Sequence, residues 1–311
     1  MSRALDEPTV TGAEPETMPE TLKERAIVLA YQALERVART LPEKTGRAIF
    51  SRAGRVAFRL APRARAVVMA NQAQVLGRSV EDPMVRASAE EAFALYARYW
   101  VDSFHLIELS DAEVLARVRC DTVDRLRDPV AAGTGAIAVL PHMGNWDAAG
   151  RWMKAIGLPV VGVAEELEPR RLYELFLAHR RALGMDIVGL SDANVGSRLA
   201  GALGANRVVA LVADRDFSGR GVDVEMFGRP RRLPAGPALL SITTGAPLMV
   251  TSMYTTREGW RIHIGEPITV EPTGDRRADV RALTAKMARG FEEAISAAPS
   301  DWHMFQPGWE P

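Results

Sequence analysis

A histidine and an aspartate stand five residues apart, at His142 and Asp147, in the segment Leu-Pro-His-Met-Gly-Asn-Trp-Asp. The apolar run Ala136–Leu140 precedes them and is expected to form a buried strand that Pro141 ends. In open α/β sheets ligands bind outside the carboxyl ends of the strands, which is where His142 would lie. A histidine whose tautomer is fixed by a carboxylate is suited to act there as a general base that takes a proton from an alcohol.

The spacing does not decide which acid would hold His142. Residues five apart on a continuous helix point roughly 140° away from each other, so His142 and Asp147 would not meet. A turn at Gly144 before the helix would instead let the imidazole fold back toward Asp147. Asp214 is a second candidate, because it follows the predicted strand Val208–Ala213 and is expected at the same sheet edge. In the alternative interpretation, His142 only ends a strand and Asp147 only favours a helix N-terminus.

Other familiar catalytic motifs are absent from the sequence. It has no Gly-x-x-x-x-Gly-Lys loop, no Gly-x-Gly-x-x-Gly segment after a strand, no His-x-x-x-His pair and no Gly-x-Ser-x-Gly elbow. The single cysteine, Cys120, permits neither an intramolecular disulfide nor a zinc site with two or more thiolates. His303, near the C-terminus, is either a second catalytic histidine or part of a segment that packs over the fold.

Short apolar runs that alternate with helical stretches predict an α/β core for residues 110–311. The expected strands are Ala136–Leu140, Val160–Ala164, Asp186–Leu190, Val208–Ala213, Leu248–Tyr254 and Trp260–Ile264. The expected helices of this core cover residues 147–156, 168–184, 192–204, 234–245 and 275–297. We therefore expect a mixed central sheet flanked by helices.

Residues 21–109 are expected to form a helical layer in front of this core. Proline and glycine separate four predicted helices, at residues 21–40, 43–60, 63–76 and 83–107. No repeat or low-complexity linker divides the chain, so residues 21–311 are interpreted as a single domain. No apolar stretch approaches the roughly 18 residues that a membrane-spanning helix needs.

The first of these helices is amphipathic. Its apolar stripe consists of Leu22, Ala26, Leu29, Ala33 and Val37. Its polar face carries the basic residues Lys23, Arg25, Arg36 and Arg39. Such a helix can lie on an anionic membrane with its apolar side down, so these four basic residues are expected to face the membrane. The alternative interpretation is a surface helix whose apolar stripe packs on its own sheet.

The formal net charge of zero is the sum of unlike segments. Residues 1–20 carry five acidic residues, one basic residue and three prolines, and are interpreted as a disordered acidic leader. Residues 21–75 carry eleven basic and three acidic residues, a net charge of +8. The neutral total argues against nucleic acid as a partner, whereas the basic helices favour a peripheral position on the cytoplasmic face of an anionic plasma membrane.

The segment from His142 to Asp147 resembles the His-x4-Asp motif of glycerolipid-type acyltransferases, in the form seen in the bacterial lipid A lauroyl/myristoyl acyltransferase superfamily. Further similar stretches follow in the same order: Tyr96-Ala-Arg-Tyr-Trp100, Val163-Ala-Glu165, Ala213-Asp-Arg-Asp216, Phe227-Gly228, Leu233-Pro-Ala-Gly-Pro-Ala238, Thr244-Gly-Ala246 and Asp301-Trp-His-Met304. The resemblance covers roughly residues 21–309 and is strongest to the phosphatidylinositol mannoside acyltransferases of actinobacteria.

This resemblance implies a glycerolipid-acyltransferase-like fold, an acyl-CoA donor, a mannosylated phosphatidylinositol as acceptor, and neither a metal nor another cofactor. It implies His142 as the base, supported by Asp147 of the motif or by Asp214, which stands where the mannoside enzymes carry a glutamate. Glu165 and Arg180 match positions that line the acceptor pocket. Arg215 is expected to meet the CoA phosphates, which suit a guanidinium fork.

Other functions remain open at this point. The same chemistry could acylate another membrane lipid, either lipid A-like or a lysophospholipid. The basic helices alone would suit a non-catalytic lipid-binding protein of the membrane surface. A metallohydrolase is the third alternative, and the few potential metal ligands argue against it.

Overall fold

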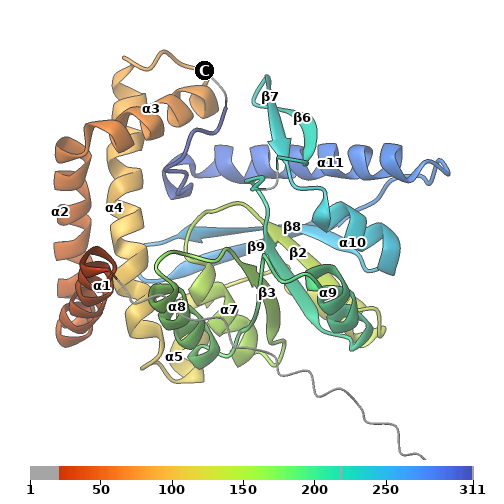
Figure 1. Ribbon diagram of the computed structural model, residues 1–311, viewed down its shortest axis with the longest axis horizontal. Helices are drawn as coiled ribbons and strands as arrows, with labels where there is room; N and C mark the ends of the chain where they lie inside the picture. Colours follow the sequence, from red (N-terminus) through yellow and green to blue (C-terminus); the bar gives the residue numbers. More distant parts are fainter. Residues whose placement is uncertain (1–20, 218, 310–311) are drawn as a thin grey trace, which may run out of the picture.

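A seven-stranded sheet crosses the centre of the molecule, and helices cover both of its faces (Figure 1). The computed structural model describes residues 21–217 and 219–309. The predicted acidic leader, residues 1–20, lies outside the described residues.

The strands and helices alternate along most of the chain after the N-terminal layer. The strands are β1 (Val118–Arg119), β2 (Ala136–Leu140), β3 (Val160–Ala164), β4 (Asp186–Gly189), β5 (Val208–Val212), β6 (Val222–Met226), β7 (Arg229–Leu233), β8 (Leu248–Thr255) and β9 (Trp260–Ile268). The helices are α1 (Leu22–Thr40), α2 (Glu43–Leu60), α3 (Pro62–Leu76), α4 (Pro83–Leu106), α5 (Asp111–Arg117), α6 (Asp124–Ala131), α7 (Trp146–Ala155), α8 (Arg170–Ala182), α9 (Val195–Gly204), α10 (Gly236–Thr244), α11 (Arg276–Ala297) and the 3-10 helix η1 (Pro299–Asp301).

The main sheet is mixed, as predicted. Its strand order is β1-β9-β8-β2-β5-β3-β4, and only the β8–β9 pair is antiparallel. The central strands β2 and β5 run parallel, with Leu140 opposite Val212. Because each strand ends at this level, the residues two positions further on, His142 and Asp214, reach the same edge of the sheet.

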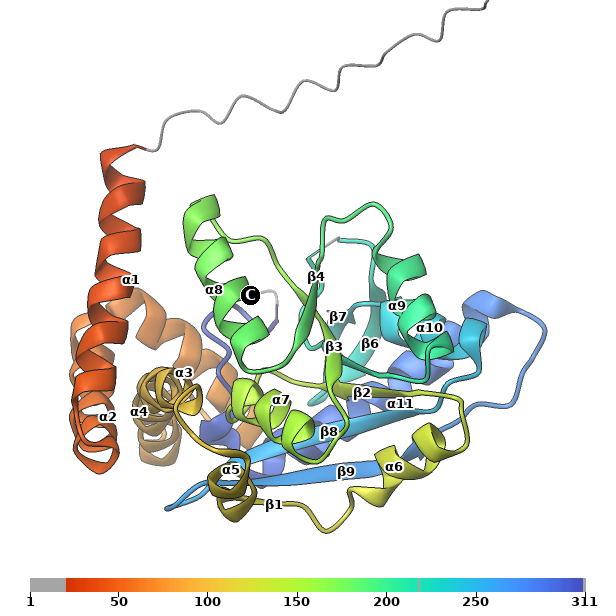
Figure 2. The ribbon, with the colours of Figure 1, turned by 90° about the horizontal axis from the view of Figure 1, so that it is seen from below.

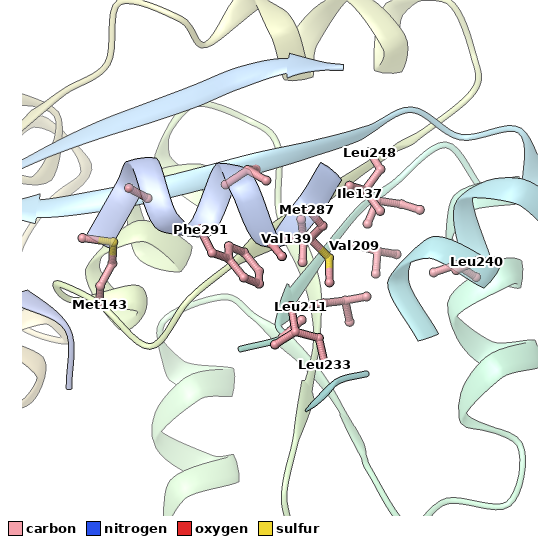
Figure 3. Close-up of a cluster of buried hydrophobic side chains, with 14 of the residues drawn as sticks. Ile137, Val139, Met143, Val209, Leu211, Leu233, Leu240, Leu248, Met287 and Phe291 are labelled. Atoms are coloured by element: carbon pink, nitrogen blue, oxygen red, sulfur yellow. The ribbon is translucent and has the colours of Figure 1, made fainter. Parts of the chain in front are cut away.

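Both faces of β2 are buried, which explains its continuous apolar sequence. Ile137 and Val139 pack in one cluster with Met287 and Phe291 of α11 (Figure 3). Ala136 and Ala138 of β2 belong to a second cluster on the opposite face, which includes side chains from α5, α6 and α7. The two cores hold β2 rigidly, and with it the loop that carries His142.

The N-terminal helices form the predicted layer at one end of the sheet. α2 packs closely on α4, where a Cβ at Gly54 would lie 2.3 Å from the backbone oxygen of Phe93. Figures 1 and 2 place α1 and α2 at the outer edge of this layer, on the side away from the sheet. The four helices begin and end within one or two residues of the predicted positions.

Six shorter elements were not predicted. They are β1, α5, α6, η1 and the strands β6 and β7, which form an antiparallel hairpin that pairs only within itself. Figure 1 shows this hairpin beside α11 and outside the main sheet. The hairpin sequence is rich in charge and contains Pro230, so it lacks the apolar pattern that identified the central strands.

Candidate active site

His142 lies directly after β2 and is paired with Asp214 after β5. The backbone N–H of His142 donates to Asp214 Oδ2 at 3.0 Å, and His142 Nδ1 lies 2.5 Å from Asp214 Oδ1. Asp214 is completely buried, whereas the side chain of His142 remains 21% exposed. The buried acid therefore holds one edge of a histidine ring that is still accessible from outside.

The charge state of Asp214 fixes the tautomer of His142. Burial by itself raises the pKa of this carboxyl, but His142, Arg231 and Trp302 outweigh burial and hold the pKa well below its usual range. An ionised carboxylate can only accept hydrogen bonds, so the Nδ1 atom of His142 is the donor. In the neutral ring the lone pair then lies on Nε2, which is the arrangement of a general base.

The C-terminal segment fastens this pair. The indole Nε1 of Trp302 donates to Asp214 Oδ2 at 2.8 Å, and the backbone N–H of His303 donates to the oxygen of His142 at 2.7 Å. The N–H of Gly144 donates to the oxygen of Asp301 at 2.9 Å. Sequence reasoning treated this segment as packing or as a second catalytic histidine, and it missed Trp302 as a partner of Asp214.

The loop between β2 and α7 turns sharply at Gly144. This residue has φ +62°, and a Cβ there would lie 2.2 Å from the oxygen of Met253. Asn145 caps α7 by accepting a hydrogen bond from the N–H of Ala148 at 2.9 Å. The predicted turn is present, but it does not bring the ring of His142 to Asp147.

Asp147 is buried in a separate network. Its Oδ2 accepts from the hydroxyls of Tyr99 at 2.7 Å and Ser103 at 3.0 Å, and its Oδ1 accepts from Nε of Arg180 at 3.1 Å. Burial raises its pKa, but Arg180 and the other partners more than compensate, so the pKa lies below the usual value. Asp147 therefore ties α7 to α4 and α8 and fixes the guanidinium of Arg180.

The remaining predicted site residues follow β3 and β5 or lie on α8, and none of them is hydrogen-bonded or ion-paired to His142 among the described residues. Glu165 is exposed and follows β3. Arg215 is partly buried and follows Asp214, with its guanidinium carbon 4.3 Å from the ring centre of Phe217. Arg180 is held by Asp147, with 20% of its side chain exposed. Among the described residues, no group of three or more His, Cys, Asp or Glu side chains is arranged to hold a metal ion.

Replacing Asp147 by asparagine is expected to lower the free energy of unfolding by about 3–5 kcal/mol, since it leaves the buried charge of Arg180 without a counterion. Urea unfolding followed by circular dichroism measures this. Asp186→Asn is the matched control, because Asp186 pairs with Arg207 at the surface, and its loss should cost less than about 1 kcal/mol. Equal losses in the two variants would contradict the anchoring role of Asp147.

His303 predicts a pH dependence of stability. Burial lowers the pKa of His303 to about 3, while the hydrogen bond from its Nε2 to the oxygen of Gly144 has a smaller opposing effect. The unfolded state therefore binds this proton first, and below about pH 6.5 stability falls by about 1.4 kcal/mol per pH unit, until the folded pKa is reached. His303→Asn should show a smaller loss than the wild type between pH 7.5 and 5.5 in urea unfolding. A loss as large as that of the wild type would contradict this assignment.

The apolar stripe of α1 points outward. Leu22, Leu29 and Val37 are 85%, 64% and 53% exposed, whereas the buried positions of α1 are Val28 and Ala38. The interpretation that this stripe packs on the sheet is wrong for the described residues. The four predicted basic residues are exposed too, and Arg39 pairs with Glu35 and Glu108.

A second helix extends this surface. On α2, Ile49, Val56 and Leu60 are 46%, 50% and 77% exposed, next to the exposed Arg52 and Arg59.

None of the helices in the described part of the chain is both long enough and apolar enough to span a membrane.

A histidine–aspartate pair at the sheet edge, in a chain that carries the His-x4-Asp spacing, is the arrangement expected of an acyltransferase. Residues 16–310 match the family of bacterial lipid A biosynthesis acyltransferases, and the chain belongs to this family. It is 35% identical over 289 residues to the phosphatidylinositol mannoside acyltransferase of Mycolicibacterium smegmatis, an alignment that covers 90% of each chain. It is 38% identical over 291 residues to the protein of that name from Mycobacterium tuberculosis, covering 90% of this chain and 87% of the relative.

Proposed function

We propose that the protein transfers a long, palmitoyl-like acyl chain from acyl-CoA to a mannose hydroxyl of a phosphatidylinositol mannoside. The observation that carries the reaction is the pair of His142 and Asp214, which leaves Nε2 of an accessible imidazole as the acceptor of a proton. The acceptor lipid follows from the names of the relatives that match nearly the whole chain.

The proposed reaction is a direct transfer between two bound substrates. Nε2 of His142 takes the proton of the mannose hydroxyl, and the oxygen forms a bond to the thioester carbonyl carbon. The carbon–sulfur bond then breaks, and the sulfur of CoA takes the proton from Nε2 as it leaves. Asp214 stabilises the imidazolium between these two proton transfers. The donor is already activated, so this route needs no covalent enzyme intermediate.

Three further residues are proposed to bind the substrates. Glu165 and Arg180 would bind the sugar hydroxyls and the anionic head group of the acceptor. Glu165 follows β3, and Arg180 lies on α8, the next helix along the chain. The contact with Asp147 supports this role of Arg180, because it holds the guanidinium in one orientation. Arg215 would meet a phosphate of CoA.

The outer surface of α1 and α2 is proposed to dock on the cytoplasmic face of the plasma membrane, which makes the protein peripheral. Its support is the combination of exposed apolar side chains with basic residues beside them. The apolar side chains would enter the boundary between head groups and acyl chains, and Lys23, Arg25 and Arg36 would meet anionic phosphates. Docking of this kind would bring a lipid acceptor to the enzyme without removing it from the bilayer.

A substrate panel tests the proposed function. The protein is incubated with palmitoyl-CoA and one of three acceptors, a phosphatidylinositol mannoside, a lysophospholipid or a lipid A precursor, while free thiol and acylated lipid are measured. The proposal expects product with the mannoside. Product with another acceptor only would replace the lipid, and binding to vesicles without thiol release for any acceptor would indicate a non-catalytic lipid-binding protein.

Charge reversal on α1 tests the docking surface. Arg25→Glu with Arg36→Glu should weaken binding to vesicles containing phosphatidylserine or phosphatidylinositol by at least about thirtyfold, given about 1 kcal/mol for each basic residue near the surface. Vesicle flotation measures this. The matched control is Arg276→Glu with Arg277→Glu, on the first turn of α11 at the opposite end of the molecule (Figure 1). Unchanged binding of the α1 variant would exclude this surface.

A further inference from the structure

Arg231 is a buried arginine that contacts the backbone of Asp214 from outside the main sheet. It lies on β7 and is only 6% exposed. Its Nη2 donates to the backbone oxygen of Asp214 at 2.6 Å. The guanidinium carbon also lies 5.3 Å from the ring centre of Trp302 and 4.9 Å from that of Trp309. Two aromatic side chains of the C-terminal segment therefore hold the cation against the acid of the candidate active site.

Asn71 of α3 holds the segment that precedes Trp309 by three hydrogen bonds. The side-chain amide of Asn71 donates to the backbone oxygens of Met304 at 3.0 Å and Gln306 at 2.9 Å, and its Oδ1 accepts from the N–H of Gly308 at 2.8 Å. This closure excludes water from the arginine. The Nη1 atom of Arg231 is buried without a hydrogen-bond partner among the described residues.

A buried cation at this position costs free energy, and the need to fill space does not explain why the residue here is charged. Removing a guanidinium from water is unfavourable, and burial lowers the pKa of Arg231 while Asp214 opposes this effect. An apolar side chain of similar length would fill the space beside Trp302 and Trp309 without this cost. What such a side chain could not provide is a positive charge and a donor beside Asp214.

We propose that Arg231 is a positioning residue for acyl transfer, which fixes the backbone of Asp214 and sets how readily the His142–Asp214 pair binds a proton. This inference rests on the proposed function, in which His142 is the base. Arg231 does not touch the substrates in this account. It acts through Asp214, whose carboxylate must accept simultaneously from the backbone and ring of His142 and from Trp302.

The charges around the pair determine the direction of the effect. Three groups act on the carboxylate of Asp214: His142 from the loop after β2, Arg231 from β7, and the indole of Trp302. Arg215 adds a positive charge near Arg231, and His303 lies near His142 but is neutral above about pH 3. Removing the charge of Arg231 therefore favours a proton on the pair, and the low-pH limb of kcat/KM should move to higher pH.

Two substitutions separate the charge of Arg231 from its guanidinium fork. Arg231→Gln loses the charge together with the fork, and Arg231→Lys retains the charge without the fork. The low-pH limb should move up by roughly half a pH unit or more in the glutamine variant and remain at the wild-type pH in the lysine variant. Arg232→Gln is the control, because Arg232 is the next residue on β7 and pairs with Asp223 at the surface.

An NMR titration of the His142 ring nitrogens in the same variants keeps this test independent of acyl transfer. The ring of His142 should take up its proton at higher pH in Arg231→Gln than in the wild type, and at the wild-type pH in Arg231→Lys. This result is expected even if the wild type transfers no acyl group, an outcome that would refute the proposed function alone. A limb and a titration unchanged in Arg231→Gln, or shifted equally in Arg231→Lys, would overturn the role of Arg231. If the glutamine variant does not fold, the lysine variant decides the role of Arg231. A shifted low-pH limb of kcat/KM in Arg231→Lys overturns this role, and a limb at the wild-type pH with reduced kcat supports it.

Discussion

Replacing His142 by alanine is expected to reduce kcat for acyl transfer by at least about a thousandfold. A positioned general base contributes on the order of 10² to 10⁴ to a rate, and the ring of His142 is the group that the buried Asp214 orients toward the exterior. Release of CoA thiol from palmitoyl-CoA, with the mannoside acceptor present, measures the effect. The variant should still bind palmitoyl-CoA as the wild type does, because the imidazole acts on the acceptor.

A second histidine provides the matched control for this prediction. His263 is exposed on β9, where its replacement by alanine removes the same side chain without touching the pair. His263→Ala is expected to transfer the acyl chain at the wild-type rate. Full activity in the His142 variant would show that another group takes the proton, and the mechanism would fail.

Replacing Asp214 by asparagine is expected to have an effect of similar size, on the order of 10³ to 10⁴ in kcat. The amide has the same shape but no charge, so it neither stabilises the imidazolium nor fixes Nδ1 as the donor. The effect should appear in kcat and not in the affinity for palmitoyl-CoA. Asp214→Glu retains the charge and is expected to recover part of the rate.

The comparison with Asp147 makes this prediction specific. Asp147→Asn removes the anchor of Arg180, so its effects should fall on stability and on KM for the acceptor. If the Asp147 variant lost as much kcat as the Asp214 variant while its KM stayed unchanged, the two acids would not have the separate roles that their contacts indicate.

Much of the core was predictable because its strands are buried on both faces. The apolar run of β2 is bounded by Gly135 and Pro141, so its position, and that of His142 after it, follow from the sequence. The hairpin of β6 and β7 could not be found in this way. Its strands are polar and owe their position to distant residues, including Glu292 of α11, which accepts from the N–H of Phe227.

The sequence left Asp147 and Asp214 as alternative partners of His142, because the choice between them depends on strand register. The pairing of Leu140 with Val212 brings Asp214 to His142, and no local spacing contains that information. Asp147 is near in sequence, but as the second residue of α7 it faces α4 and α8 instead. A motif that names His142 and Asp147 together therefore spans two networks with different neighbours.

The apolar stripe of α1 was visible in the sequence, whereas its direction was not. A period of 3.6 residues predicts an amphipathic helix, but either a protein core or a membrane can accept the apolar side. In the structure the contacts of α1 with α4 and α8 use other positions, among them Tyr31, whose ring meets Phe104 and Phe176. The stripe is left outside because of this tertiary packing.

The most direct test of the proposed function is the stoichiometry of product formation by the wild-type protein. Purified protein is incubated with palmitoyl-CoA and anionic vesicles that contain a phosphatidylinositol mannoside, and mass spectrometry quantifies the lipid while a thiol reagent quantifies free CoA. One palmitoyl ester on a mannose is expected for each CoA released, with both signals lost in His142→Ala. Thiol release without an acylated mannoside, or equal product from the His142 variant, would contradict the proposed function.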